Sequence, residues 1–365
     1  MIPLCIPKIE GNEWKYVKEC FDTNWISSVG KYVDLFEVKF AEYVTAKEAV
    51  VTMNGTAAIE LALRTLGIGE GDEVITSSMT FISPVNTIKY VGAEPVFVDV
   101  CRDTYVMDAE KIEEMITPKT KAILPVHIYG HPVDMDKIME IAKKHNLYVI
   151  EDATEALGSE YKGKKSGTIG DIGCFSFNGN KLITTGAGGM LVTNNEKWGK
   201  RAKYLSTQTK TTLENGAFYH EEVGYNFRMP NVLAAMGVAQ LEKANEYLEA
   251  KIKHAKLYNE SLKNVKGITI PVEKDQVKNC FWLYSILVED NYGFTRDEVI
   301  KKLIADGVQC RPFFQPVHLM PPYKDCRHGD MSVTIEIAEK GINLPSSVDL
   351  PAEDIKKVCN LLKGN

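Results

Sequence analysis

Short apolar runs alternate with stretches of helical periodicity over the first two-thirds of the chain. Seven of these runs predict strands, and several are rich in β-branched residues and unbroken by polar positions, as strands buried on both faces should be. We expect these strands at Ala49–Met53, Glu73–Thr76, Pro95–Val100, Ala122–Val126, Tyr148–Glu151, Gly173–Phe177 and Gly189–Thr193. Helical patterns lie between many of them, at Thr56–Leu66, Ser83–Val91, Asp108–Ile116 and Asp134–His145. The alternation predicts an α/β fold with a parallel or mixed sheet covered by helices on both sides.

The last third of the chain is organised differently. A long helical pattern at Met229–Leu262 is interpreted as the link between two domains. Beyond it, the expected elements are strands at Cys280–Val288 and Gly307–Pro312 and helices at Thr295–Asp306 and Ala352–Leu362. The pattern predicts a large domain over residues 1–245 and a smaller α+β domain over residues 246–365.

Composition narrows the class of protein. The 365 residues are 44% hydrophobic, which is enough to bury one large and one smaller core. The formal net charge of -6, without a long basic run, argues against nucleic acid as a partner, because phosphate backbones require clustered Lys and Arg. The chain starts without a signal-peptide pattern and its longest apolar stretches are of strand length, so we expect a cytoplasmic protein without a membrane span. Eight scattered cysteines without a CxxC pair fit reduced thiols.

Two segments carry residues suited to covalent chemistry. In V-I-E-D-A-T-E-A, residues 149–156, an apolar strand delivers Asp152 at its C-terminal end, where ligands bind in open α/β sheets. A carboxylate there can hold a cationic ring nitrogen, although a helix cap would place an acid similarly. Lys181 lies on a tight turn between N-G-N and a glycine-rich return. Partial burial would lower the pKa of its amine and free it for imine formation, whereas an exposed turn lysine would be inert.

Other strand ends carry polar or aromatic residues that suit a phosphate and a flat ring. Gly55 and Thr56 open a helix, whose free N–H groups can cradle a phosphate, and Ser176 can add a hydroxyl. Phe81 can stack on a heteroaromatic ring, or simply pack in the core. The G-Y-N-F-R-M-P-N segment, residues 224–231, offers amide and Arg donors for an acidic group, or caps a helix. No GxGxxG or GK[ST] loop is present, which argues against a nicotinamide enzyme and a Walker site.

The histidines and the later cysteines do not predict a metal site. His127, at the end of a predicted strand, is interpreted as structural. The Cys and His residues of the segment 310–328 have spacings that match no structural zinc pattern. Arg311, His318 and Tyr323 of that segment can instead line a polar ligand cleft.

Taken in order, these segments resemble one family. The series N-G-T, T-F, E-D-A-T-E-A, S-F-N-G-N-K-L-I-T-T-G-A-G-G-M and G-Y-N-F-R-M is similar to the sugar aminotransferases of the DegT type, nearly end to end. These are pyridoxal-phosphate (PLP) enzymes of fold type I, like aspartate aminotransferase. The resemblance implies a mixed, mostly parallel seven-stranded sheet with a smaller α+β domain. The resemblance favours the cofactor-binding interpretation of each segment over the structural alternative given for it.

The resemblance also implies residue roles. Lys181 corresponds to the Schiff-base lysine and Asp152 to the acid that pairs with the pyridine nitrogen. The residues corresponding to the other cofactor contacts are Gly55, Thr56 and Ser176 at the phosphate, Phe81 stacked on the ring, Glu155 near the phenolic oxygen, and Asn226. In the family this last amide reaches the cofactor of the neighbouring subunit, which implies a homodimer with shared active sites. Some relatives carry histidine at the lysine position and act as dehydratases, so Lys181 favours transamination.

The implied reaction moves an amino group from L-glutamate to a nucleotide-linked keto-sugar, for surface glycan biosynthesis. The motifs most resemble the C4-aminotransferases of 4-keto-6-deoxy sugars. Asn178 favours a UDP-4-keto-6-deoxy-N-acetylhexosamine, with GDP-4-keto-6-deoxymannose and a 3-keto sugar or cyclitol as alternatives. Candidates for the sugar-nucleotide cleft are Trp25, Ser27, Gly30, Arg228, Arg311, His318 and Tyr323. A PLP-binding regulator without turnover would usually carry a DNA-binding module, for which the motifs leave no unassigned segment.

Overall fold

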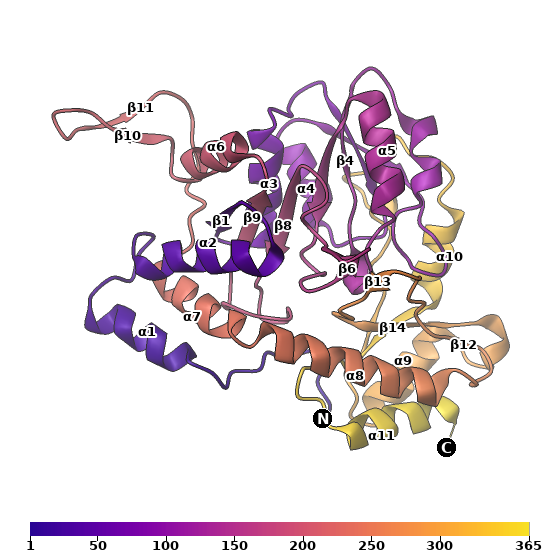
Figure 1. The fold of residues 1–365 in the computed structure, drawn as a ribbon. Coiled ribbons are helices and arrows are strands. Elements are labelled where there is room, and N and C mark those ends of the chain that lie inside the picture. The colour runs from indigo at the N-terminus through magenta and orange to yellow at the C-terminus, as the bar shows by residue number, and fades with distance from the viewer. Residues whose placement is uncertain (365) are drawn as a thin grey trace.

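The computed structural model describes residues 1–364, and a seven-stranded sheet forms its centre (Figure 1). The strand order is β1-β9-β8-β5-β4-β2-β3. The bounds are β1 (Glu48–Thr52), β2 (Glu73–Ser77), β3 (Glu94–Val98), β4 (Thr120–Leu124), β5 (Tyr148–Asp152), β8 (Ile172–Ser176) and β9 (Gly189–Thr193). All neighbouring strands are parallel except β9, which runs antiparallel to both β1 and β8. The predicted mixed, mostly parallel sheet is therefore confirmed, strand by strand.

Helices pack on this sheet because their apolar stripes face it. They are α2 (Lys31–Val44), α3 (Gly55–Thr65), α4 (Ser83–Tyr90), α5 (Met135–His145) and α6 (Glu196–Ser206). Helix α3 packs on β8 and β9, and α5 packs on β4 and β5. The start of α3 is set by Asn54, whose side-chain oxygen accepts a hydrogen bond from the Ala57 N–H at 2.8 Å. This cap fixes the helix N-terminus at the carboxyl end of β1.

One predicted helix, Asp108–Ile116, is replaced by two short 3₁₀ helices, Ala109–Lys111 and Glu113–Met115. Its buried apolar residues are Ala109, Ile112 and Met115. They recur every third position, which matches the three-residue turn of a 3₁₀ helix better than the 3.6-residue turn of an α-helix.

The predicted long helix Met229–Leu262 is two helices, α7 (Asn231–Leu241) and α8 (Ala244–Leu262). Helix α7 is apolar nearly all round and packs against α2 and α1 (Glu13–Asp22). Helix α8 packs instead against α11 (Ala352–Lys363). Because the two halves cover different surfaces, the helix is interrupted at Glu242–Lys243, which the shared apolar periodicity does not reveal.

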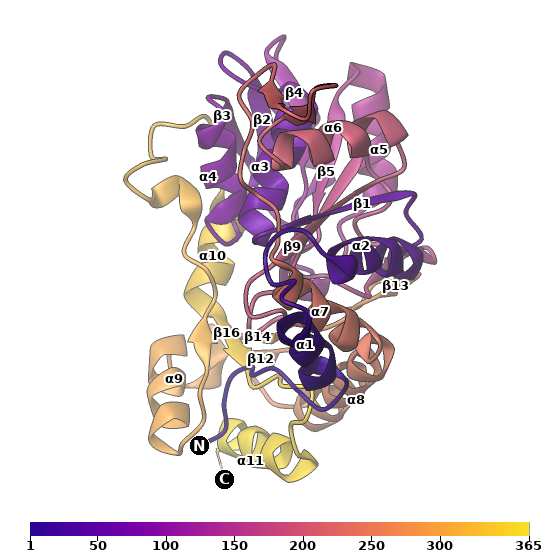
Figure 2. The same cartoon turned by 90° about the vertical axis from the view of Figure 1, so that its left-hand side faces the viewer.

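A second hydrophobic core lies between α8, α11 and a four-stranded sheet, at the end of the molecule opposite β10 and β11 (Figures 1 and 2). This sheet has the order β12-β14-β16-β15. Its elements and neighbours are β12 (Ile268–Thr269), β14 (Tyr284–Val288), β15 (Arg311–Pro312), β16 (Gly341–Leu344), α9 (Arg296–Ala305) and α10 (Ser332–Lys340). Ile2 also packs in this core and its backbone bridges to Val308, so the N-terminal residues lie beside the last helix. The domain boundary near residue 245 stays a prediction.

A hairpin projects from the body of the molecule (Figure 1). It consists of β10 (Lys210–Thr212) and β11 (Phe218–His220), and the Phe218 side chain is 64% exposed. A further small sheet joins β6 (Glu160–Tyr161), β7 (Lys164–Lys165) and β13 (Val277–Lys278). Within residues 1–364, no helix combines the length and apolar character that crossing a membrane requires.

Gly173, the second residue of β8, offers a test of how tightly this sheet is packed. A Cβ atom at this position would lie 1.9 Å from the carbonyl oxygen of Gly167, a backbone atom that can move only with its loop. We expect Gly173→Ala to lower the free energy of unfolding by at least about 2 kcal/mol. Gly69→Ala is the matched control, because its Cβ would meet only the Val91 carbonyl oxygen at 3.5 Å. Equal urea-unfolding midpoints for the two variants would contradict the packing described here.

Candidate active site

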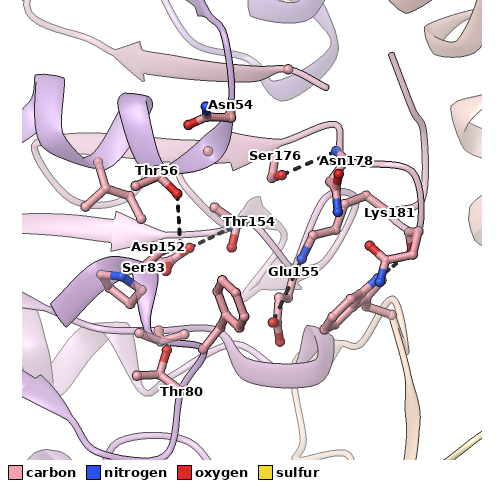
Figure 3. A pocket seen from close by; sticks show the side chains of 18 of the residues that line it. Asn54, Thr56, Thr80, Ser83, Asp152, Thr154, Glu155, Ser176, Asn178 and Lys181 are labelled. Atoms are coloured by element: carbon pink, nitrogen blue, oxygen red, sulfur yellow. Dashed lines mark hydrogen bonds and ion pairs between the residues drawn. The ribbon is translucent and has the colours of Figure 1, made fainter. Parts of the chain in front are cut away.

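A cavity of about 270 Å³ lies at the carboxyl ends of the central strands. Its walls come from the residues that follow β1, β2, β4, β5 and β8, together with two aromatic residues from the last third of the chain (Figure 3). Of the eight cofactor residues expected from the sequence, seven line it: Gly55, Thr56, Phe81, Asp152, Glu155, Ser176 and Lys181. The parallel strands bring these residues together because their carboxyl ends lie along one edge of the sheet.

One end of the cavity fits a phosphate group. The N-terminus of α3 faces it, and a Cβ atom on Gly55 would lie 2.9 Å from the Cβ of Ser176 and 3.1 Å from the Cγ2 of Thr154. Only glycine therefore leaves the helix N–H groups accessible at this point. The Thr56 hydroxyl donates to the Ser83 hydroxyl oxygen at 2.9 Å, which keeps a second oxygen beside the helix start. Free N–H groups, hydroxyls and a space that a side chain would fill form the donor set that phosphate requires.

Asp152 supplies a buried carboxyl group to the middle of the cavity. It ends β5, is 2% exposed, and its Oδ1 accepts a hydrogen bond from the Thr154 N–H at 3.0 Å. Burial raises the pKa of Asp152, and the hydrogen bonds from Thr154 and the charge of Lys181 oppose that rise. A cationic ring nitrogen placed in the cavity would stabilise the charged carboxylate, as the sequence predicts for pyridoxal phosphate.

The carboxylate of Glu151, the neighbour of Asp152 in β5, has hydrogen-bond partners from the protein on both oxygens. Its oxygens accept the N–H groups of Gly167, Ile169 and Gly170 at 2.6–2.7 Å. The ring of His127 completes the set, with 2.9 Å between its Nε2 and Glu151 Oε2. His127 is thus a buried structural residue, and its Nδ1 accepts the Val133 N–H at 3.1 Å, which leaves the ring proton on Nε2.

Lys181 enters the cavity from the turn after β8, and its side chain points toward Glu155 (Figure 3). Its Nζ lies 3.9 Å from Glu155 Oε1 and 3.7 Å from the centroid of the Trp282 ring. Burial lowers the pKa of Lys181, while the charges of Glu155 and Asp152 act in the opposite direction. Burial also raises the pKa of Glu155 to about 7. The lysine amine is therefore more readily freed of its proton than a surface lysine.

Aromatic side chains form another wall of the cavity. Phe81 is 53% exposed and its ring centroid lies 5.8 Å from that of Phe314. Phe314 in turn stacks on Tyr129 at 5.6 Å, and the Tyr129 N–H donates to Glu155 Oε2 at 2.8 Å. Tyr129 has a φ of 53°, a left-handed conformation that the surrounding packing must hold in place. An exposed ring beside the cavity is suited to cover one face of a flat cofactor.

Several residues that line the cavity were not identified from the sequence. Among them are Thr80, Ser83, Thr154, Asn180, Trp282 and Phe314. Thr154 follows Asp152 by two positions in E-D-A-T-E-A, so the motif itself contained the signal. Trp282 and Phe314 lie more than 100 residues beyond Lys181, and no local spacing links them to the lysine.

The sequence-predicted residues outside this cavity occupy two regions. Near the start of α7, Arg228 is buried and pairs with Glu37, while Asn226 is exposed. The backbone oxygens of Trp25 and Ser27 accept hydrogen bonds from Asn231 at 2.7 and 2.6 Å. Gly30 touches the same asparagine, because a Cβ there would lie 2.3 Å from Asn231 Cγ. These contacts place the Trp25–Gly30 loop beside α7.

The other region consists of β15 and the segment after it. Arg311 is exposed on that edge strand. His318 is buried, with its Nδ1 2.7 Å from the Ser78 hydroxyl oxygen, and burial lowers its pKa. The Tyr323 hydroxyl donates to Asn86 Oδ1. In this chain His318 joins the segment after β15 to the residue after β2, and Tyr323 joins it to α4. Their part in a substrate cleft stays a prediction.

Comparison with known proteins gives consistent results. Residues 7–363 match the DegT/DnrJ/EryC1/StrS aminotransferase family. GDP-perosamine synthase of Caulobacter vibrioides is 45% identical, and that of Escherichia coli O157:H7 is 44% identical, each over 98% of this chain and 96% of the relative. The crystal structure of the aminotransferase TlmJ from Streptoalloteichus hindustanus superposes with a TM-score of 0.94 at 28% identity, covering 100% of this chain and 98% of that one.

The similarity extends over the strands, the cavity and the lysine turn, and the cavity itself fits the cofactor of this family. The phosphate end, the buried carboxyl and the partly desolvated lysine are the three features that PLP requires. The chain therefore belongs to the DegT/DnrJ/EryC1/StrS aminotransferase family and is a PLP-dependent sugar aminotransferase of nucleotide-sugar pathways.

Proposed function

We propose that the protein transfers an amino group from L-glutamate to C4 of GDP-4-keto-6-deoxymannose, giving a GDP-linked 4-amino-4,6-dideoxy sugar for surface glycans. The observation that carries the proposal is the identity of 45% and 44%, over nearly the whole chain, to two relatives named GDP-perosamine synthase. The preference for a UDP-sugar depended on the asparagine at position 178, a single side chain at the cavity wall. Similarity over the full chain supports the GDP-sugar alternative better than that one residue supports UDP.

The residues of the cavity would hold PLP in a defined orientation. Lys181 would bind it covalently through Nζ, and the N-terminus of α3 with Ser176 would hold its phosphate. Asp152 would keep a proton on the ring nitrogen, and Phe81 would cover the ring. Bound PLP then supplies an electron sink, which stabilises the negative charge formed when a proton leaves the carbon next to the amino group.

Lys181 would also move the proton in both halves of the reaction. Its Nζ lies 3.9 Å from Glu155 Oε1, and burial favours the neutral amine that accepts a proton. Glu155 lies between Lys181 and the backbone N–H of Tyr129. With a pKa of about 7, its carboxyl can exist in the protonated form and donate a hydrogen bond to an oxygen of the cofactor.

We infer that two chains form a homodimer with shared sites. The side chains of Trp14 and Phe21 on α1, Trp25 after it, and Phe218 on the projecting hairpin are 56–76% exposed. Trp14 and Phe21 are seven positions apart and so lie on one face of α1, and exposed apolar side chains on one face are typical of a surface covered by another protein. Asn226 is exposed near the same hairpin, as expected for an amide that contacts the cofactor of a second subunit.

An amination assay tests the proposed substrate. We would incubate purified protein with PLP, L-glutamate and the 4-keto-6-deoxy sugars of GDP, UDP and dTDP separately, and follow the product mass. We expect conversion of ketone to amine with the GDP-sugar, and loss of at least about 1,000-fold in rate for Lys181→Ala. Amination of the UDP-sugar alone would overturn the nucleotide assignment. A Lys181→Ala rate equal to that of the unmodified protein would overturn the mechanism.

Burial of Glu155 predicts a pH-dependent stability of the protein without cofactor. Between its ordinary pKa of 4.5 and its folded value of about 7, the folded chain keeps the proton that the unfolded chain loses. The contribution of Glu155 to the free energy of unfolding should therefore fall by roughly 3 kcal/mol as pH rises through this window, and stay level above it. Glu155→Gln has no proton to lose, so it should lack this decline. Urea unfolding of both proteins at pH 5.0 and 7.5 measures it, and parallel pH profiles would contradict the burial argument.

Mixed dimers test the shared site. If Asn226 serves the partner's cofactor, a dimer of one Lys181→Ala chain and one Asn226→Ala chain keeps one intact site. Random mixing of the two inactive variants should then restore about a quarter of the full activity, because half of the dimers are mixed and each has one working site. If Asn226 served its own subunit, every site in the mixture would carry one lesion. No recovery would then be seen after unfolding and refolding the two variants together.

A further inference from the structure

The indole of Trp282 covers the amine of Lys181. The distance from Lys181 Nζ to the centroid of the ring is 3.7 Å, well inside the roughly 6 Å over which an aromatic face attracts a cation. Trp282 is only 6% exposed, so water contributes little to this contact. The residue comes from the segment before β14, so the contact joins the last third of the chain to the turn after β8.

Hydrogen bonds at both ends hold this ring in place. The indole Nε1–H donates to the carbonyl oxygen of Asn180, the residue before Lys181, at 2.7 Å. The backbone carbonyl of Trp282 accepts from Lys251 Nζ at 3.0 Å. Lys251 lies on α8, is 2% exposed, and also donates to the carbonyl of Ser346. Burying an ammonium group is costly unless its donors are hydrogen-bonded, so Lys251 needs both of these carbonyl oxygens as partners. The two bonds therefore hold the Trp282 segment in one position.

The other groups that act on the Lys181 amine come from three segments. Glu155 and Asp152, at and after the end of β5, favour its charged form, and Glu155 is the nearer at 3.9 Å. The thiols of Cys5 and Cys280 also lie close enough to act on it electrostatically. Burial opposes all of them. The ring face of Trp282 adds an attraction for the ammonium that does not depend on the protonation of any other group.

We propose that Trp282 is a positioning residue for proton transfer: its ring face holds the protonated amine of Lys181 whenever that amine is not covalently bound to the cofactor. The inference rests on the proposed function, because it requires Lys181 to accept a proton and return it. Held between the ring and Glu155, the ammonium stays inside the cavity that would take the cofactor. Without the ring, the charged form has only the carboxylates to stabilise it.

Two substitutions separate attraction by the ring from simple exclusion of water. Trp282→Phe keeps a ring with a weaker negative face, and Trp282→Met keeps an apolar cover without any ring. If the ring face attracts the ammonium, the pKa of Lys181 should fall in the order Trp, Phe, Met, by about 0.5 to 1 in total. If the indole only excludes water, the pKa should stay the same or rise in the Met variant.

The pKa can be measured without turnover. The full-length protein, freed of cofactor, would be labelled with trace acetic anhydride between pH 6 and 11, and the labelled Lys181 peptide quantified by mass spectrometry. Trp198→Phe is the matched control, because this half-buried tryptophan packs against Tyr148, on the strand β5. We expect the Trp198→Phe curve to overlie that of the unmodified protein. A Lys181 pKa that is unchanged or raised in both Trp282 variants would overturn the proposal.

Kinetics of the holoenzyme give a second readout. We expect kcat to fall about 5- to 20-fold in Trp282→Met, with the KM for L-glutamate changed less than about twofold, because the ring acts on proton transfer and not on donor binding. A rise in KM with kcat unchanged would overturn the positioning role. The labelling experiment uses no sugar, so its result would remain valid if the GDP-sugar assay failed. Conversely, a normal labelling curve in the Trp282 variants would leave the substrate assignment intact.

Discussion

A buried carboxylate needs hydrogen-bond donors or a positive charge, and the end of β5 carries two carboxylates side by side. Successive residues of a strand face opposite sides of the sheet, so Glu151 and Asp152 meet different surroundings. Glu151 receives three backbone N–H groups and His127, and is satisfied by the protein alone. Asp152 receives the Thr154 N–H and otherwise faces the cavity. The fold thus closes around one carboxylate and leaves the other for a cationic ligand.

The remaining features of the site follow from that division. The loop wrapped around Glu151 precedes β8, whose carboxyl end supplies Ser176 and then the turn with Lys181. The close contact of Gly55 with Ser176 brings the start of α3 to the same edge of the sheet. The phosphate end, the ring-nitrogen acid and the lysine are therefore placed by the ends of β1, β5 and β8, which lie in one half of the sheet. This is why one cavity holds them in a fixed relation.

The last third of the chain completes this arrangement. Trp282 and Phe314 enter the cavity from segments that pack between the two cores, and Lys251 on α8 holds the backbone of Trp282. The lysine environment therefore depends on how the smaller unit sits against the large sheet. Of the residues predicted for the sugar-nucleotide cleft, Trp25, Ser27 and Arg311 are exposed in the single chain.

The sequence by itself determined the strands of the sheet and the chemistry at their ends. Apolar runs bounded by polar turns are local patterns, and seven of the eight predicted cofactor residues lie in or within a few residues after such runs. Local pattern could not distinguish one helix from α7 and α8, because the same periodicity fits both and only the surfaces they cover differ. Asp108–Ile116 was predicted as an α-helix, but its buried apolar residues recur at every third position and form 3₁₀ turns. Only the tertiary structure placed Trp282 over Lys181, since a contact across 101 residues leaves no trace in spacing.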